Sequence, residues 1–234
     1  QAGQQQPQAA LKRLEDLTQR APQNAQAWRA LADVRQSTGA EPAKVAQAIE
    51  QAVQVAPTEA RPRVMLVDHH LRQKEAKQAL AVAQTAVAAL PESADVVASL
   101  GRAQAANSEH NQAIATFNKL VSLMPQSPTP YMLMAGAQAA NKDAKAAMQS
   151  LGKALDVQAD FLPAQRALAE MALQNRQSEQ ALAISKTVQK QRPDQAIGHA
   201  LEGDIQAAGK QWEAAAKAYR AGLQLAAVPE LVKA

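Results

Sequence analysis

Apolar and polar positions along the chain follow the period of amphipathic helices, and the whole pattern recurs at a longer, constant spacing of about 34 residues. Prolines follow apolar helical stretches at equal steps at Pro57, Pro91 and Pro125, and again two steps further on at Pro193. Small residues keep the same step in the second helix of each unit, at Ala79, Ala113, Ala147, Ala181 and Ala215. Because separate positions keep one period, the pattern predicts repeated helix-turn-helix units.

Residues suited to turns keep the same period. They recur at the common step at Gly39, Gln73, Asn107, Asn141, Asn175 and Gly209. Glycine and asparagine tolerate the left-handed conformation that ends a helix, so we expect these positions to end the first helix of each unit. The step from Pro22 to Pro57 is one residue longer than the others. We expect the extra residue between Ala32 and Gly39, where a turn absorbs it.

The period places two helices in each unit. The first helices are predicted near 26–37, 60–72, 94–106, 128–140, 162–174 and 196–208. The second helices are predicted near 42–55, 76–89, 110–123, 144–157, 178–191 and 212–225. An additional helix near 7–20 has the register of a second helix and predicts half a repeat.

These elements divide the chain into a repeat array with short flanking segments. Residues 1–6 are expected to be disordered, and 228–234 are expected to begin a further, truncated repeat. The array between them is predicted to comprise 7–22, 23–57, 58–91, 92–125, 126–159, 160–193 and 194–227.

The residues that mark the period resemble those of the tetratricopeptide repeat family. First-helix matches are Trp28, Leu31 and Ala32, Leu100 and Gly101, and Tyr131 and Ala135. Second-helix matches are Ala113, Phe117 and Pro125, with Ala215 and Tyr219. The resemblance covers about residues 7–227 and implies an all-α, right-handed α-solenoid of about six units and a leading half repeat. Neighbouring units bury the apolar face that a single helix pair cannot bury alone.

Glu202 departs from this pattern, because the matching positions hold Leu31, Leu66, Leu100, Met134 and Leu168. An unpaired charge at a packing position is costly. We expect the carboxylate to reach water or a basic partner such as Lys217 or Arg220, with a ligand contact as the alternative. Gly203 is expected to be the small residue, equivalent to Gly101, that lets two helices approach.

Composition supports an all-α chain and argues against several kinds of ligand. Hydrophobic residues make up 47% of the chain and aromatic residues 3%, and alanine, the best helix former, dominates the hydrophobic fraction. The net charge is +4 with no basic block, and stacking aromatics are few, so nucleic-acid binding is not expected. The absence of cysteine excludes disulfides and thiolate metal sites.

No motif in the chain predicts catalysis, a cofactor or a metal. The glycine spacing at 203–210 is one residue too long for a phosphate-binding loop, and Gln211 follows Lys210. His69 and His70 are helix neighbours that point about 100° apart, so they do not easily share a metal. We expect one ring to face inward and the other to lie at a groove edge. The chain is therefore predicted not to be an enzyme.

The repeat resemblance implies a concave face lined by the first helices, at four positions in each unit. In the second and third units these are Arg61, Val64, Asp68 and Leu71, then Asp95, Ala98, Arg102 and Ala105. The candidate binding residues on this face are Arg29, Asp33, Arg61, Asp68, Arg102, Met132, Arg166, Glu170 and Asp204. Their mixed charge around a small, apolar middle suits an extended peptide or a helix. Solvated surface, or packing on further repeats, is the alternative.

Three stretches, 99–135, 161–174 and 198–223, are similar to the large tetratricopeptide lipoproteins found with bacterial PEP-CTERM protein-sorting and exopolysaccharide systems. That resemblance implies a periplasmic scaffold for exopolysaccharide assembly or export and for protein sorting. In the full-length protein it would be tethered to the membrane by an N-terminal lipid. A generic peptide-binding adaptor, cytoplasmic or periplasmic, is the first alternative. A polysaccharide-binding module that uses Phe161 and Trp212 is the second, and the oligomeric state stays open.

Overall fold

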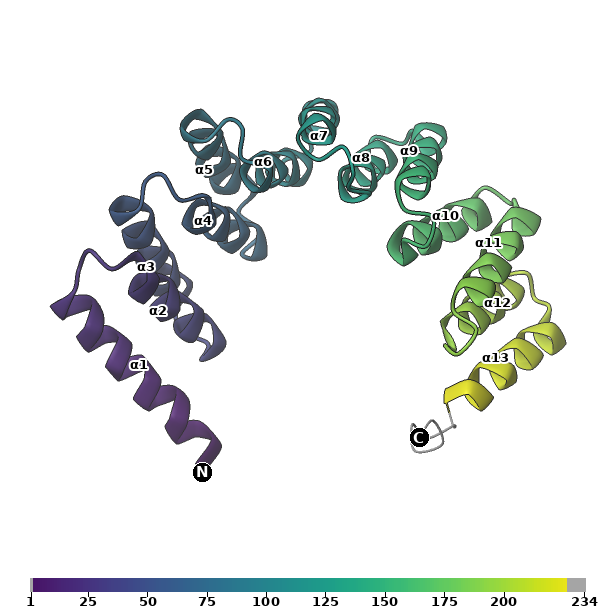
Figure 1. The fold of residues 1–234 in the computed structure, drawn as a ribbon, viewed down its shortest axis with the longest axis horizontal. Helices are drawn as coiled ribbons and strands as arrows, with labels where there is room; N and C mark the ends of the chain where they lie inside the picture. Colours follow the sequence, from purple (N-terminus) through teal and green to yellow (C-terminus); the bar gives the residue numbers. More distant parts are fainter. Residues whose placement is uncertain (1, 227–234) are drawn as a thin grey trace. The chain divides into compact units, whose positions relative to one another are not determined.

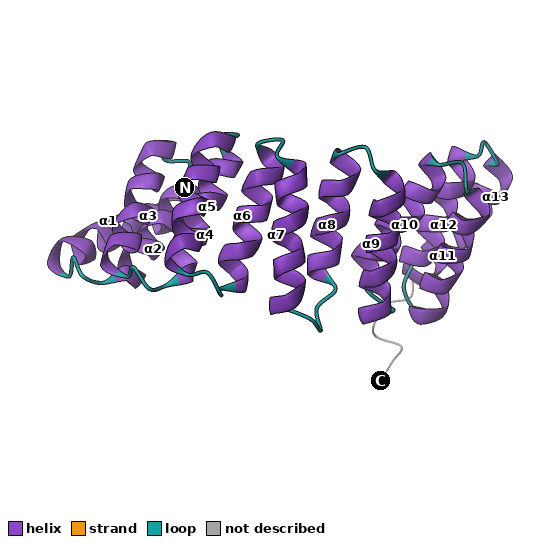
Figure 2. Ribbon diagram, turned by 90° about the horizontal axis from the view of Figure 1, so that it is seen from above, coloured by secondary structure: helices purple, strands orange, loops and turns teal. Residues whose placement is uncertain are grey.

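A computed structural model describes residues 2–226, and every element within them is an α-helix (Figures 1 and 2). The helices are α1 (Ala2–Arg20), α2 (Ala25–Ser37), α3 (Pro42–Val55), α4 (Ala60–Arg72), α5 (Ala76–Ala89), α6 (Ala94–Ala106), α7 (His110–Leu123), α8 (Thr129–Ala140), α9 (Ala144–Val157), α10 (Leu162–Gln174), α11 (Ser178–Gln191), α12 (Ile197–Ala208) and α13 (Trp212–Ala226). The all-α prediction is confirmed. The predicted start of a further repeat at 228–234 lies outside the described residues.

The helices form two compact units, which are described separately. Unit 1 (Gln1–Met124) holds α1 to α7, and unit 2 (Pro125–Ala234) holds α8 to α13. In unit 1, α2 packs on α3, α4 on α5 and α6 on α7, and each pair also contacts the first helix of the next pair within the unit. Unit 2 repeats this arrangement with the pairs α8 and α9, α10 and α11, and α12 and α13. This is the packing of an α-solenoid.

Each first helix ends in the same hydrogen-bonded turn. In the turn after α4, the amide of Lys74 donates to the carbonyl of Leu71, and the amide of Glu75 donates to that of His70. Both bonds belong to the Schellman motif, in which the residue after the C-cap is left-handed. The left-handed residues have φ between 59° and 72° and are Gly39, Lys74, Ser108, Lys142, Arg176 and Lys210.

The predicted turn positions do end the first helices, but among them only Gly39 is itself left-handed. Asn107, Asn141, Asn175 and Gly209 are C-cap residues with φ between −87° and −79°, and the left-handed residue follows each of them. Gly39 and Lys74 are the equivalent left-handed residues of the first two repeats, and they lie one residue further apart than the common step of about 34. The extra residue of the first repeat consequently lies between Gly39 and Pro42, where the turn has room, and not before Gly39 as predicted.

Helix α1 is longer than the sequence predicts. It begins at Ala2 and contains Pro7, so the expected disorder of residues 1–6 does not agree with the helical backbone from Ala2. Alanine and glutamine are adequate helix formers, whereas Pro7, beyond the first turn, removes one backbone hydrogen bond and its ring crowds the carbonyl of Gly3. The helix packs on α2, and Glu15 of α1 forms a 3.1 Å ion pair with Arg35 of α2.

The core consists of clusters that each join a helix pair to the following first helix. One cluster in unit 1 combines Ala32 of α2, Ile49 of α3 and Leu66 of α4. In two helix pairs, a glycine on the first helix faces a large aromatic ring on the second helix. A Cβ atom at Gly101 would lie 2.3 Å from the ring of Phe117, and one at Gly203 would lie 2.4 Å from the ring of Tyr219. The prediction that Gly203 and Gly101 permit close helix approach is confirmed.

Candidate functional site

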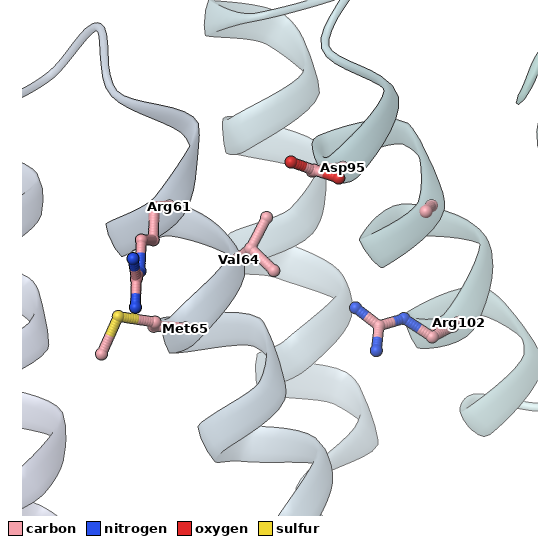
Figure 3. Close-up of a pocket in the computed structure, with 6 residues that line it drawn as sticks. Arg61, Val64, Met65, Asp95 and Arg102 are labelled. Carbon is pink, nitrogen blue, oxygen red and sulfur yellow. The ribbon is translucent and has the colours of Figure 1, made fainter. Parts of the chain in front are cut away.

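The candidate site is a cleft of about 370 Å³ between the first helices α4 and α6 of unit 1 (Figure 3). Helix α4 contributes Arg61, Val64 and Met65, and helix α6 contributes Asp95, Ala98 and Arg102. Five of these six residues occupy positions that the sequence analysis assigns to the concave face, at four positions in each first helix; we call this set the first-helix stripe. The structure therefore brings the predicted stripes of the second and third units together around one hollow, which we call the α4–α6 cleft.

Helix periodicity explains why these side chains reach the surface. Residues three or four positions apart share one face of a helix, as Arg61, Val64 and Met65 do. The opposite side of α4 is anchored in the core by Leu66, Val67 and other buried side chains. Since the cleft residues stand on helices fixed by packing, the shape of the cleft is set by the repeat stack and not by loops.

The ends of the cleft carry charge, and its floor is apolar. Figure 3 shows Val64 between Arg61 on one side and Asp95 and Arg102 on the other. Arg102 reaches back to α4, where its Nη2 atom lies 3.0 Å from Oδ1 of Asp68. The two side chains are 39% and 31% exposed, so this ion pair contributes at most about 1 kcal/mol to stability. Its main effect is to fix the guanidinium at the cleft.

The other two charges of the α4–α6 cleft have no ion-pair partner within residues 2–226. Arg61 and Asp95 are both exposed, and neither forms an ion pair with another described residue. The Nε atom of Arg102 is buried without a hydrogen-bond partner among the described residues. The cleft thus offers one cation and one anion open to a ligand, and an immobilised arginine, around Val64, Met65 and Ala98.

The other predicted site residues do not join this cleft. In unit 1, Arg29 pairs with Glu59 at 3.1 Å, and Asp33 is exposed. In unit 2, Met132 packs against a core cluster, whereas Arg166 and Glu170 are exposed on α10.

Asp204 of α12 is held by a tyrosine of the following helix. It accepts a 2.8 Å hydrogen bond from the hydroxyl of Tyr219, and this bond raises the pKa of Tyr219. One side of the Tyr219 ring lies against Gly203, and the residue is 37% exposed.

The structure also supplies a partner for Glu202. Glu202 accepts a 2.7 Å hydrogen bond from Nε2 of Gln189 on the preceding helix, so its partner is Gln189 and not Lys217 or Arg220 as expected.

Met65 lines the α4–α6 cleft but was not predicted, because it lies outside the four positions that the sequence assigns to the concave face of each first helix. A large, flexible side chain next to Val64 was the available signal.

The histidines and the two aromatic residues proposed for sugar stacking occupy different environments in the part of the chain that the structure describes. His69 is buried, and burial lowers its pKa below the ordinary 6.5, while His70 shares a 2.7 Å hydrogen bond with Glu75 at the turn. His69 therefore faces inward as expected, and the ring of His70, within α4, is directed toward the turn that follows the helix. Phe161 is partly buried against the core, which leaves Trp212 as the exposed ring of the two proposed for sugar stacking.

Residues 2–226 contain neither a cluster of metal ligands nor a membrane-spanning helix. They contain no group of three or more histidine, aspartate or glutamate side chains placed to hold a metal ion. None of the helices formed by these residues has the length and apolarity that crossing a bilayer requires.

Comparison with known proteins identifies the architecture. Residues 70–137 match the family model described as tetratricopeptide repeat. A tetratricopeptide repeat protein from Parabacteroides merdae superposes with a TM-score of 0.69 at 14% identity, over 99% of this chain and 91% of that one. The chain has the tetratricopeptide repeat fold.

Other tetratricopeptide repeat structures support the same fold. A thermophilic one from Thermus thermophilus gives a TM-score of 0.60 at 20% identity, covering 79% of this chain and 98% of that one. YrrB, described as a tetratricopeptide repeat protein with an unusual peptide-binding site, gives 0.50 at 17% identity, covering 77% and 93%. No curated protein is similar enough in sequence to count as a relative. At these identities the likeness shows the fold alone.

Proposed function

We propose that the chain is a non-catalytic interaction scaffold that holds an extended segment of a partner protein in the α4–α6 cleft. The observation that carries this proposal is the cleft itself, in which fixed and free charges surround an apolar floor. Peptide grooves use this combination, with apolar contacts for affinity and charges for register. The description of YrrB as having a peptide-binding site supports a role of this kind for the fold.

The cleft chemistry defines the partner segment. Val64, Met65 and Ala98 accept an apolar side chain, and Met65 adapts to its shape. Arg61 pairs with an acidic group on one side of that residue, and Asp95 pairs with a basic group on the other. Arg102 needs little reorganisation because Asp68 already holds it. The partner is therefore a peptide in which an apolar residue stands between opposite charges.

The test is a selection of displayed random peptides on the whole chain, followed by affinity measurements on purified variants. Arg61→Glu is the informative change, because Arg61 has no ion-pair partner to lose among the described residues. Arg102→Glu would also place a carboxylate beside Asp68 and disturb the fold. We expect Arg61→Glu to weaken binding of the selected peptides about tenfold, because their acidic group then meets a carboxylate. The matched control Arg13→Glu, on the exposed surface of α1, should leave affinity unchanged. Equal affinity in the wild type and both variants would remove the α4–α6 cleft as the site.

The finer role we propose is a scaffold in the bacterial periplasm for exopolysaccharide assembly or export and PEP-CTERM protein sorting, with a lipid tether on the full-length protein. Its support is the sequence resemblance of 99–135, 161–174 and 198–223. A generic adaptor is equally consistent with the fold. A pull-down from envelope extract separates the two. Polymer-synthesis, export or sorting proteins captured by the wild type and not by Arg61→Glu support the finer role. Capture of only unrelated cytoplasmic proteins leaves the generic adaptor.

A further inference from the structure

A groove with a largely polar lining lies between α1 and α3 of unit 1. Its volume is about 460 Å³, within the range of about 300–1,000 Å³ that is usual for small-molecule sites. Helix α2 contributes Trp28, Leu31 and Arg35, and the remaining lining consists of polar side chains of α1 and α3. We call it the α1–α3 groove. It shares no residue with the α4–α6 cleft.

The repeat stack itself leaves a groove of this kind open. Unit 2 has a counterpart of about 220 Å³ between α9 and α11, although α8 packs on α9 and α12 packs on α11. A helix packed on α1 as α8 packs on α9 would therefore leave the α1–α3 groove open. Four lining positions are equivalent, so that Thr18, Trp28, Gln47 and Gln51 in unit 1 correspond to Leu155, Gln165, Ala183 and Thr187 in unit 2. Of the two grooves, that of unit 1 is the larger and the one that holds a tryptophan.

The charges of the α1–α3 groove are already paired. Nη2 of Arg35 lies 3.1 Å from Oε1 of Glu15, and Nη1 of Arg35 donates a 2.9 Å hydrogen bond to the carbonyl of Lys44. The Arg35 side chain is 16% exposed, so it is held firmly between α1 and α3. A charged ligand would have to compete with this ion pair, whereas a neutral ligand leaves it intact.

Three glutamine amides are open to a ligand. Gln19 projects from α1, and Gln47 and Gln51 project from α3 on the other side of the groove. None of the three side chains forms a hydrogen bond with another described residue. An amide both donates and accepts hydrogen bonds, as a hydroxyl group does. The groove is therefore suited to a neutral ligand that carries several hydroxyl groups.

Trp28 adds an apolar surface to these amides. Its Nε1 atom donates a 2.8 Å hydrogen bond to the carbonyl of Pro22, so the one polar atom of the indole is used and the ring offers only carbon to the groove. The buried Leu31 provides a second apolar group. A sugar ring has an apolar C–H face and a rim of hydroxyl groups, which matches an aromatic surface bordered by amides.

We propose that the α1–α3 groove binds a neutral saccharide, with the C–H face of one sugar ring on Trp28 and its hydroxyl groups bonded to Gln19, Gln47 and Gln51. A peptide segment fits the groove less well, because the groove offers no unpaired charge to set the register of a peptide. The proposal uses a ring that the repeat pattern assigns to packing, in place of Phe161 and Trp212. It does not depend on the peptide role of the α4–α6 cleft.

The test begins with an array of immobilised neutral and acidic oligosaccharides, probed with the fluorescently labelled whole chain. Saccharides that are captured are then titrated in solution against the Trp212→Phe chain, in which Trp28 is the one remaining tryptophan. We expect neutral saccharides to be captured and to change the emission of Trp28 in a saturable way. This readout reports on the groove itself, because Trp28 lines it.

Variants of the amides avoid disturbing Trp28, which packs against a core cluster. Gln47→Ala and Gln51→Ala should each weaken saccharide binding about threefold to tenfold, since each removes one hydrogen-bonding amide. Alanine is the residue that unit 2 holds at the position of Gln47. Gln54→Ala, at an exposed glutamine of α3 outside the groove, is the matched control and should leave the affinity unchanged. Circular dichroism verifies that all three variants are folded.

Several results would overturn the proposal. Capture of no saccharide, or of acidic saccharides alone, would show that the groove does not recognise a neutral sugar. Binding that leaves the emission of Trp28 unchanged, or that ignores both Gln47→Ala and Gln51→Ala, would place the saccharide elsewhere. Saccharide binding that is lost with Arg61→Glu would place it in the α4–α6 cleft. A selected peptide whose affinity falls with Gln47→Ala and not with Arg61→Glu would make the occupant of the groove a peptide.

Discussion

The sharpest prediction for the fold concerns the substitution Gly101→Ala. Gly101 lies on α6, and a Cβ atom there would be 2.3 Å from Cε1 and 2.7 Å from Cζ of Phe117 on α7. Phe117 is 2% exposed, so its ring has no free space into which it can turn. The repeat in unit 2 with alanine at the equivalent position, Ala135, carries the smaller Leu151 opposite it. The volume at one position therefore limits the volume at the other.

These distances set the magnitude. Overpacking a well-filled core costs about 1–3 kcal/mol, and alanine gains about 1 kcal/mol over glycine within a helix. Gly101→Ala should therefore lower the free energy of unfolding by up to about 2 kcal/mol. Adding Phe117→Leu recreates the pair of Ala135 and Leu151, so the double variant should lose about 1–2 kcal/mol less than the sum of the single losses.

The assay is urea unfolding followed by far-ultraviolet circular dichroism, with hydrogen exchange of α6 and α7 amides, because a repeat array opens locally. Gly136→Ala is the matched control. It changes a helical glycine whose added Cβ meets nothing within 4 Å, so it should raise stability by up to about 1 kcal/mol. If Gly101→Ala were as stable as Gly136→Ala, the volume argument would be refuted.

Three further predictions test local features. Gly39→Ala should lower the free energy of unfolding by about 1 kcal/mol, because Gly39 has a left-handed φ of 72°. Gly209→Ala, at a right-handed C-cap, should leave this free energy unchanged, and thermal unfolding compares the two variants. Burial lowers the pKa of His69 in the folded state, so the stability that depends on neutral His69 should be complete above pH 6.5 and fall as the pH drops from 6.5 toward the lowered pKa. The variant His69→Gln should show a weaker pH dependence in urea titrations repeated at several pH values. Gln189→Leu should lose about 1–3 kcal/mol in chemical unfolding by removing the donor to the half-buried Glu202, and the additional change Glu202→Leu should restore most of that loss.

The helices were predictable from the sequence because one period controls several positions at once. Proline, alanine and turn residues that share this period locate nearly every helix end to within one residue. The left-handed positions were misassigned, because lysine or serine occupies the strained site and the tolerant Asn107 or Asn141 precedes it. Only the Schellman hydrogen bonds show which of the two residues is left-handed. Composition likewise gave no sign that α1 continues to Ala2 through Pro7.

The candidate site was predictable as a set of positions but not as a geometry. The first-helix stripe follows from helical spacing, and five of its positions do line the α4–α6 cleft. Arg102 is paired with Asp68, whereas Arg61 stays open to a ligand. This difference depends on how far side chains reach between neighbouring repeats, and the spacing of residues along the chain does not reveal that reach. The partner of Glu202 was missed for the same reason, since Gln189 stands on the preceding helix.

Photo-crosslinking shows directly whether a partner segment lies in the α4–α6 cleft. A photoreactive amino acid replaces Val64, or Gln84 on the exposed surface of α5 as the control, and the chain is irradiated with a selected peptide. We expect a crosslink from position 64 that is lost with Arg61→Glu, and none from position 84. Equal crosslinking from both positions, or crosslinking at position 64 that survives Arg61→Glu unchanged, would contradict this expectation.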